Sequence, residues 1–191
     1  MQNGALSELL SHWKLENPYI IGHDFGGSTV LRTHLLNEVS FSKIILVDPV
    51  AVAPWGSTFF RHVKNYEDAF QGIPEYIHEE IVSTYVKGAM HKEVSVETLE
   101  GIKRPRLGKQ GQEAFYRQIV QANQKYTDEV EPLYKSINVP VLILWGEEDT
   151  WIPLERGQKL HERVSTSSFV TIPEAGHLCR KINQQPCYLI Y

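Results

Sequence analysis

The chain has 191 residues, 42% of them hydrophobic, and a formal net charge of −4. This length favours one globular domain, and no apolar run reaches the ~18 residues of a membrane span. The basic residues are dispersed, apart from a small cluster at 103–106, and the first residues lack the pattern of a signal peptide. We therefore expect a cytoplasmic protein that binds neither nucleic acid nor membrane.

The two cysteines, Cys179 and Cys187, lie close together near the C-terminus. Neither belongs to a C-x-x-C pair or to a His/Cys cluster with the spacing of a metal site, so we expect neither zinc nor a disulfide framework. A reducing compartment is the ordinary setting for such thiols. We expect a protein that needs no metal and no organic cofactor.

Both ends of the chain show strands and helices in alternation. Short, mainly apolar and β-branched runs predict four strands, at 19–21, 44–48, 141–145 and 168–172. Apolar residues at helical spacing predict helices within 26–39 and 154–164, and residues 5–15 look like the end of a helix that precedes the first of these strands. Because the apolar runs are continuous rather than alternating, they suit parallel strands that are buried on both faces. The pattern predicts an α/β fold with a mostly parallel sheet.

The middle of the chain, residues 50–135, has no convincing strand. Its aromatic and apolar residues recur at helical spacing, as Phe59, Val63 and Phe70 do, and prolines and glycines separate the segments. We therefore predict an α/β core made of residues 1–49 and 136–191, interrupted by a helical insertion at 50–135.

Residues 22–27 read Gly-His-Asp-Phe-Gly-Gly and lie between a predicted strand and a predicted helix. This is the context of a nucleophile elbow, with Asp24 where Ser is usual. Glycines let the backbone turn sharply, so that the central side chain projects above the sheet, and the helix N-terminus favours an anion. The alternative is a glycine-rich turn in which Asp24 only caps the helix.

Two further side chains follow predicted strands. Asp149 comes three residues after Gly146, and His177 follows the strand at 168–172. Open α/β sheets build their sites at the carboxyl ends of the strands, and the chain order of nucleophile, acid and histidine is that of an α/β-hydrolase triad. Asp48, at the end of the strand 44–48, is the rival for the acid.

Together these motifs resemble the α/β-hydrolase fold proteins with an aspartate nucleophile, the haloalkane dehalogenases and epoxide hydrolases, whose elbows read G-H-D-W-G or G-H-D-F-G. The resemblance covers roughly 15–178. It implies that Asp24 is the nucleophile, Asp149 the acid partner and His177 the base, and that 50–135 is a helical cap. It also implies strands before residue 19, so we expect a partial α/β-hydrolase fold, from a fragment or a frameshifted product.

The chemistry of the three residues fits this resemblance. A carboxylate is ionised near neutral pH and suits attack on an sp³ carbon of an epoxide or a carbon–halogen bond, which leaves an alkyl ester on Asp24. His177 would then activate water to hydrolyse the ester, and Asp149 would hold the imidazole. The expected substrate is a small, largely apolar molecule held between sheet and cap.

Aromatic side chains are the candidates for substrate contact: Phe25, Trp55, Tyr116 and Trp151. Phe25 stands where the dehalogenases carry a Trp that donates to the halide, and it has no such donor, which weakens that subtype. Epoxide hydrolases protonate the leaving oxygen with two cap tyrosines, and the candidates here are Tyr66, Tyr76, Tyr85 and Tyr116. His23 is expected to be a buried, hydrogen-bonded residue rather than a catalyst.

Two other functions remain open from the residues. One is a non-catalytic truncated fragment or a binding protein that keeps the pieces of the fold. The other is an esterase-like or lactonase-like hydrolase in which Asp24 forms no ester. A covalent adduct on Asp24 separates the leading hypothesis from both.

Overall fold

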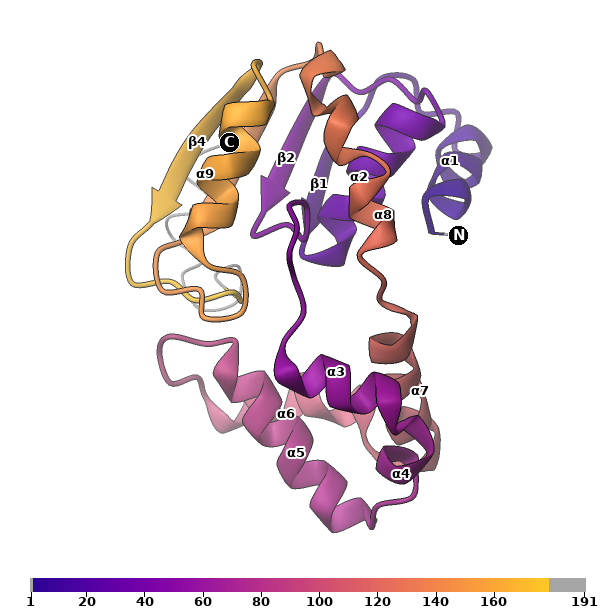
Figure 1. The fold of residues 1–191 in the computed structure, drawn as a ribbon, viewed down its shortest axis with the longest axis vertical. Helices are drawn as coiled ribbons and strands as arrows, with labels where there is room; N and C mark the ends of the chain where they lie inside the picture. The colour runs from indigo at the N-terminus through magenta and orange to yellow at the C-terminus, as the bar shows by residue number, and fades with distance from the viewer. Residues whose placement is uncertain (1, 179–191) are drawn as a thin grey trace.

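The computed structural model describes residues 2–178, and within them four strands form one parallel sheet in chain order (Figure 1). The strands are β1 (Tyr19–His23), β2 (Lys43–Val47), β3 (Val141–Gly146) and β4 (Ser167–Ile172). All four predicted strands are confirmed, with ends that differ by one or two residues. The parallel register aligns His23 with Val47 and Gly146 with Ile172, so the loops that follow the strands meet at one edge of the sheet.

Burial differs between the central and outer strands. Every residue of β3 is buried, and so are the last four residues of β2. β1 lies at one side of the described sheet, and Tyr19 and Ile21 on it are exposed. The expectation of strands buried on both faces therefore holds for β2 and β3, whereas β1 has a strand neighbour on only one side.

Helices that pack with the sheet come from both ends of the chain. They are α1 (Gln2–His12), α2 (Phe25–Leu36), α8 (Lys125–Asp128), the 3-10 helix η2 (Glu131–Ser136) and α9 (Leu154–Arg163). Their apolar side chains form a core with the strands that includes Leu31, Ile143 and Leu160. Tyr134 is buried in the same core, and its hydroxyl donates to the Ala51 carbonyl at 2.7 Å.

A second group of helices lies below the carboxyl ends of the strands in Figure 1. It consists of α3 (Thr58–Asn65), α4 (Glu67–Gln71), α5 (Glu75–Gly88), α6 (Val96–Lys103), the 3-10 helix η1 (Arg104–Arg106) and α7 (Gly108–Gln121). This group has its own apolar core, around Val63, Val82 and Ile119. The absence of strands from the middle segment, all of which is described, agrees with the helical prediction.

The bounds of the insertion, 50–135, stay a prediction. Because Val130 and Tyr134 pack in the core of the sheet, we propose that the cap itself comprises residues 58–121, with connections on either side. No helix within residues 2–178 is both long and apolar enough to cross a membrane. Cys179 and Cys187 lie outside the described residues.

Candidate active site

Asp24 occupies the sharp turn between β1 and α2. Its backbone has φ 53° and ψ −125°, a conformation that costs a non-glycine residue of order 1–3 kcal/mol. Backbone hydrogen bonds hold it there: its N–H donates to the Val47 carbonyl at 3.2 Å, and its carbonyl accepts from Gly27 at 3.0 Å and Val50 at 3.1 Å. The side chain makes no capping hydrogen bond and is 31% exposed, so the helix-cap interpretation is not supported.

Close packing at the turn requires two of its three glycines. A Cβ on Gly22 would lie 2.7 Å from the Gly26 carbonyl oxygen, and a Cβ on Gly27 would lie 2.4 Å from the Cβ of Pro49. A Cβ on Gly26 would meet nothing within 4 Å. Gly22 and Gly27 therefore let the strand, the helix and the Pro49 loop approach one another, which fixes the place of Asp24.

The structure brings the three predicted residues together. The Nδ1 of His177 lies 2.8 Å from the Oδ2 of Asp149, and the Nε2 of His177 lies 3.8 Å from the Oδ1 of Asp24. The other oxygen of Asp149 accepts hydrogen bonds from the backbone N–H groups of Trp151 at 2.8 Å and Ile152 at 2.9 Å. With both carboxylate oxygens engaged, Asp149 is held in the orientation that fixes the imidazole.

Asp48, the rival for the acid, has a different partner. It is fully buried, and its Oδ1 accepts a hydrogen bond from the backbone N–H of Gly146 at 2.8 Å. The bond ties the end of β2 to the end of β3. The hydrogen-bond geometry at Nδ1 of His177 thus favours Asp149 as the acid partner, and Asp48 contributes to the junction of the strands.

His177 is almost completely buried between two carboxylates. Burial alone lowers the pKa of its imidazole, but the hydrogen bond to Asp149 and the negative charges of Asp149 and Asp24 outweigh this and raise the pKa to about 10. The two carboxylates therefore favour the protonated imidazolium form of His177 in the resting site. Its Nε2, buried and 3.8 Å from Asp24, has no hydrogen-bond partner among the described residues.

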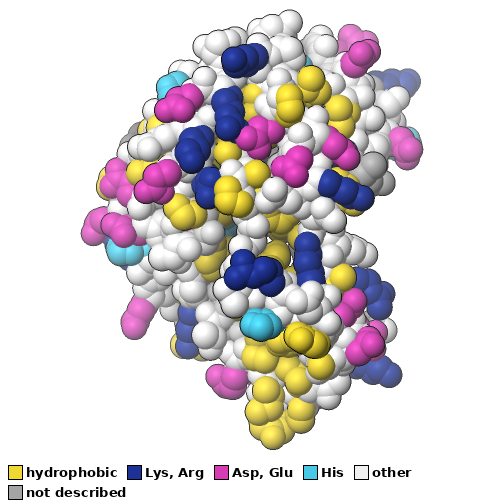
Figure 2. Space-filling model, viewed as in Figure 1, with side chains coloured by type: hydrophobic (Ala, Val, Ile, Leu, Met, Phe, Trp, Pro, Cys, Tyr) yellow, Lys and Arg dark blue, Asp and Glu magenta, His cyan; other side chains and the backbone are white. Residues whose placement is uncertain are grey.

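A cavity of about 410 Å³ opens onto Asp24 and His177, between the edge of the sheet and the helical cap. In Figure 2 hydrophobic side chains are visible in the hollow between these two parts. The sheet side contributes His23, Asp24, Phe25, Trp151, His177 and Leu178. The cap contributes Phe60, Tyr85, Val86, Gly101, Ile102, Pro105, Arg106, Phe115, Gln118 and Ile119. Most of the wall is apolar, as expected of a small-molecule site.

Two of the predicted aromatic residues, Phe25 and Trp151, line this cavity. The indole ring of Trp151 lies between two other rings, with centroids 5.1 Å from His177 and 4.4 Å from Tyr85. The plane of the Trp151 ring is tilted by 31° to the His177 ring and by 37° to the Tyr85 ring. The three rings join the sheet to the cap beside the nucleophile.

The prediction that Tyr116 contacts substrate is not supported. Tyr116 is fully buried in the cap core, where its hydroxyl bonds to Nδ1 of His78 at 3.0 Å, and it does not line the cavity. Of the other candidate cap tyrosines, Tyr66 and Tyr76 are 60% and 71% exposed. Tyr85 alone among the four lines the cavity, and burial together with the charge of Asp24 raises its pKa.

Sequence reasoning missed Arg106, which lines the cavity from the end of η1. In the sequence Arg106 belongs to the basic cluster 103–106. A run of basic residues usually lies on the solvent-exposed surface, so the sequence offered no reason to place Arg106 in a cavity. His23 is half-buried and not fully buried as expected, but it is hydrogen-bonded: its Nε2 lies 2.9 Å from the His177 carbonyl.

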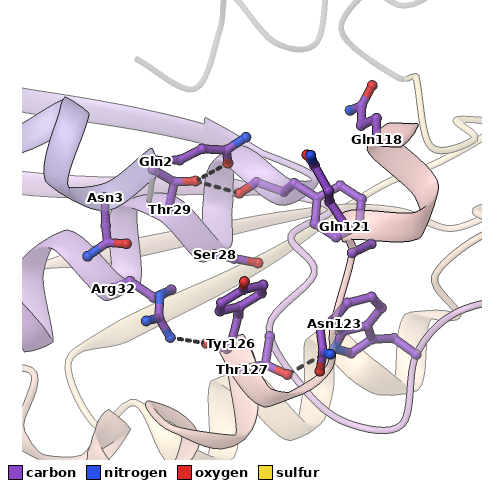
Figure 3. A pocket seen from close by; sticks show the side chains of 13 residues that line it. Gln2, Asn3, Ser28, Thr29, Arg32, Gln118, Gln121, Asn123, Tyr126 and Thr127 are labelled. Atoms are coloured by element: carbon purple, nitrogen blue, oxygen red, sulfur yellow. Dashed lines mark hydrogen bonds between the residues drawn. The ribbon is translucent and has the colours of Figure 1, made fainter. Parts of the chain in front are cut away.

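A second pocket, of about 450 Å³, lies on the other side of Phe25, between α1, α2 and the α7–α8 segment (Figure 3). Polar side chains in its wall include Gln2, Asn3, Ser28, Thr29, Arg32, Gln121, Asn123 and Thr127, although apolar atoms make up most of the wall surface. Trp55 lies here, where its Nε1 donates to Thr127 at 2.9 Å, and its ring meets Phe25 edge-on. Because Asp24 and His177 do not line this pocket, the chemistry belongs to the smaller cavity, and Trp55 is one layer removed from it.

One set of side chains in residues 2–178 has the spacing of a metal site: the ligand atoms of His23, Asp48 and His177 lie within 4.8 Å of one another. All three have protein partners, as Nε2 of His23 meets the His177 carbonyl, Asp48 accepts from Gly146, and His177 pairs with Asp149. We therefore propose, as the sequence led us to expect, that the protein needs no metal.

Comparisons with known proteins bear on the family. The family model described as "Alpha/beta hydrolase family" matches residues 4–180. An alpha/beta hydrolase fold protein from Burkholderia ambifaria, known from its crystal structure, is 42% identical with a TM-score of 0.92 over 98% of this chain and 69% of that one. An esterase from Exiguobacterium antarcticum is 20% identical, with a TM-score of 0.75 over 98% and 70% of the two chains, which shows a shared fold.

A curated relative matches as well. The uncharacterized hydrolase YugF of Bacillus subtilis is 24% identical over 184 residues, which is 89% of this chain and 62% of that protein. The chain therefore spans less than two thirds of the length of this relative.

Proposed function

This chain belongs to the alpha/beta hydrolase family, and we propose that it hydrolyses a small electrophilic substrate through a covalent ester on Asp24. The observation that carries the proposal is a carboxylate on the elbow, 3.8 Å from Nε2 of a buried histidine whose Nδ1 pairs with Asp149. A serine at this position would need a base to remove its proton, whereas a carboxylate is already a nucleophile.

In the first step a carboxylate oxygen of Asp24 attacks an sp³ carbon of the substrate. The new carbon–oxygen bond forms as the bond to a halide or to an epoxide oxygen breaks, and the leaving atom takes the bonding electron pair. For an epoxide, the hydroxyl of Tyr85, which lines the same cavity, supplies a proton to the developing alkoxide.

The second step depends on the change that the first one makes. Ester formation removes the negative charge of Asp24, one of the two carboxylates that keep the pKa of His177 high. The imidazolium then loses its proton, to solvent after a halide has left or to the Tyr85 phenolate after an epoxide has opened. The neutral Nε2 next takes a proton from water while the water oxygen attacks the ester carbonyl. The helix α2 begins directly after Asp24, and its positive N-terminal end favours the developing oxyanion. Collapse of the tetrahedral intermediate then releases an alcohol and the Asp24 carboxylate.

An esterase-like or lactonase-like hydrolase is the second candidate. The fold that this chain shares with the Exiguobacterium esterase is compatible with this second candidate. Attack by Asp24 on an ester would give a reactive anhydride, so in this candidate Asp24 would not be the nucleophile.

Intact-mass measurement on the His177→Gln variant tests the proposal. Incubated with a panel of epoxides, haloalkanes and esters, this variant should accumulate an alkyl ester that peptide mapping assigns to Asp24, because no base remains to activate water. The double variant with Asp24→Ala should gain no mass. Turnover of esters by the unmodified chain without any adduct would support the second candidate, and binding without turnover would indicate a non-catalytic protein.

A further inference from the structure

The charges that line the catalytic cavity are few. They are Asp24, His177 and Arg106, and the remaining wall is largely apolar. Asp24 and His177 belong to one ion-paired group with Asp149. Arg106 takes part in none of the ion pairs formed among residues 2–178. The cavity thus contains one cation without an acidic partner in the described part of the chain.

The backbone of Arg106 is held in place by a buried side chain of the cap. Its carbonyl accepts a hydrogen bond at 2.7 Å from Nε2 of His78, a side chain buried in the cap core. Its own Nη1 donates to the Ile102 carbonyl, which stops one edge of the guanidinium from swinging freely. The half-buried side chain therefore faces the cavity from a fixed turn, a preorganised arrangement for a ligand.

The guanidinium and the nucleophile act on the same part of the cavity. Both charges influence the hydroxyl of Tyr85, since Asp24 raises its pKa and Arg106 lowers it. A guanidinium has five N–H donors, and only one is used by Ile102 in the structure. When an apolar molecule displaces water from the cavity, the other donors lose their partners, which is unfavourable unless the molecule supplies acceptors.

We propose that Arg106 binds a carboxylate on the substrate, so that the enzyme acts on small organic acids with an apolar body and an electrophilic carbon. This inference rests on the proposed function and names its substrate class. Two charges of opposite sign orient the molecule: the carboxylate is attracted to Arg106 and repelled by Asp24, which leaves the electrophilic end at the nucleophile. A single cation without an acidic partner suits a monoanionic carboxylate, which it can hold bidentately, better than a phosphate dianion.

Binding measurements test this inference without requiring turnover. Isothermal titration calorimetry at pH 7.5 compares 3-phenylpropanoate with its neutral amide, 3-phenylpropanamide, on the full chain. We expect the acid to bind at least about tenfold more tightly than the amide. Arg106→Met should abolish this preference, and Arg106→Lys should keep part of it. Arg104→Met, an exposed residue of the same turn that does not line the cavity, is the matched control and should keep it fully.

The outcomes separate this inference from the proposed function. Amide binding as tight as that of the acid, no binding of the acid, or an unchanged preference in Arg106→Met would each overturn the role of Arg106. The first two outcomes use the unmodified chain and so do not depend on how the variants fold. A preserved acid preference without any adduct on Asp24 in the His177→Gln variant would instead overturn the covalent mechanism alone.

Discussion

The Oδ1 of Asp24 lies 3.8 Å from the Nε2 of His177, and in the mechanism we propose this pair controls when the base can act. While Asp24 is ionised, it helps to hold the pKa of His177 near 10, so the imidazole stays protonated. Once Asp24 is esterified, that contribution is gone and the imidazole can accept a proton. The geometry therefore supports an order of events in which the base becomes available only after the nucleophile has reacted.

Removal of the Asp24 charge should lower the pKa of His177. In Asp24→Ala only Asp149 continues to raise it, while burial continues to lower it, so the value should fall below about 10. An NMR titration of the imidazole protons measures this directly. Glu174→Ala, which removes a surface carboxylate paired with Lys92, is the control and should leave the titration unchanged. An equal or higher pKa in Asp24→Ala would contradict the coupling.

The raised pKa of His177 also predicts how stability depends on pH. The group titrates near 10 in the folded chain and near its ordinary value of 6.5 when unfolded, so the folded state binds the proton more tightly. The stabilisation is complete below pH 6.5 and is lost as the pH rises toward 10. The unfolding midpoint of the unmodified chain should therefore fall over this window, as measured by circular dichroism. In His177→Gln the fall should be much shallower; a parallel decline in both proteins would show that other groups cause it.

Local motifs made the sheet and the meeting of Asp24, Asp149 and His177 predictable. Every residue of the runs at 44–48 and 141–145 except Asp48 is apolar, because these strands are covered on both faces. The elbow and Asp149 adjoin strand ends whose place in the fold is fixed. The cap was less predictable. Tyr85 and Tyr116 both occur among apolar residues at helical spacing, and only packing between helices turns one into the cavity and the other into the cap core. Arg106 gave no signal for the same reason.

Substituting each candidate acid by asparagine in turn distinguishes a catalytic role from a structural one. Asp149→Asn removes the charge that stabilises the imidazolium and disturbs its tautomer, so hydrolysis of the Asp24 ester should slow by about 10²- to 10⁴-fold. Rapid-quench mass spectrometry should then show the adduct accumulating. Asp48→Asn weakens the bond to Gly146, and it should lower the unfolding temperature without accumulation of adduct. Accumulation in Asp48→Asn and not in Asp149→Asn would reverse the assignment.

Tyr85→Phe should affect substrates according to their leaving group. Opening an epoxide creates an alkoxide that needs a proton, whereas a halide leaves as a stable anion. Loss of the Tyr85 hydroxyl should therefore slow adduct formation with epoxides by about 10²-fold and leave the rate with haloalkanes nearly unchanged. Tyr116→Phe, which removes a hydroxyl bonded to His78 inside the cap, serves as the comparison and should alter stability more than either rate. Equal slowing of both substrate classes in Tyr85→Phe would indicate a packing role only.

Two neighbouring glycines of the elbow should respond oppositely to the same substitution. Gly27→Ala places a Cβ 2.4 Å from the Cβ of Pro49, so the helix or the loop must shift, at a cost of about 1–3 kcal/mol. Gly26→Ala meets nothing within 4 Å and lies in the first turn of α2, where alanine restricts the unfolded chain more than glycine does. Its free energy of unfolding should stay unchanged or rise by about 0.5–1 kcal/mol. Denaturant unfolding of both variants measures the difference, and a Gly27→Ala variant as stable as the unmodified chain would show that the elbow is not fixed by close packing against Pro49.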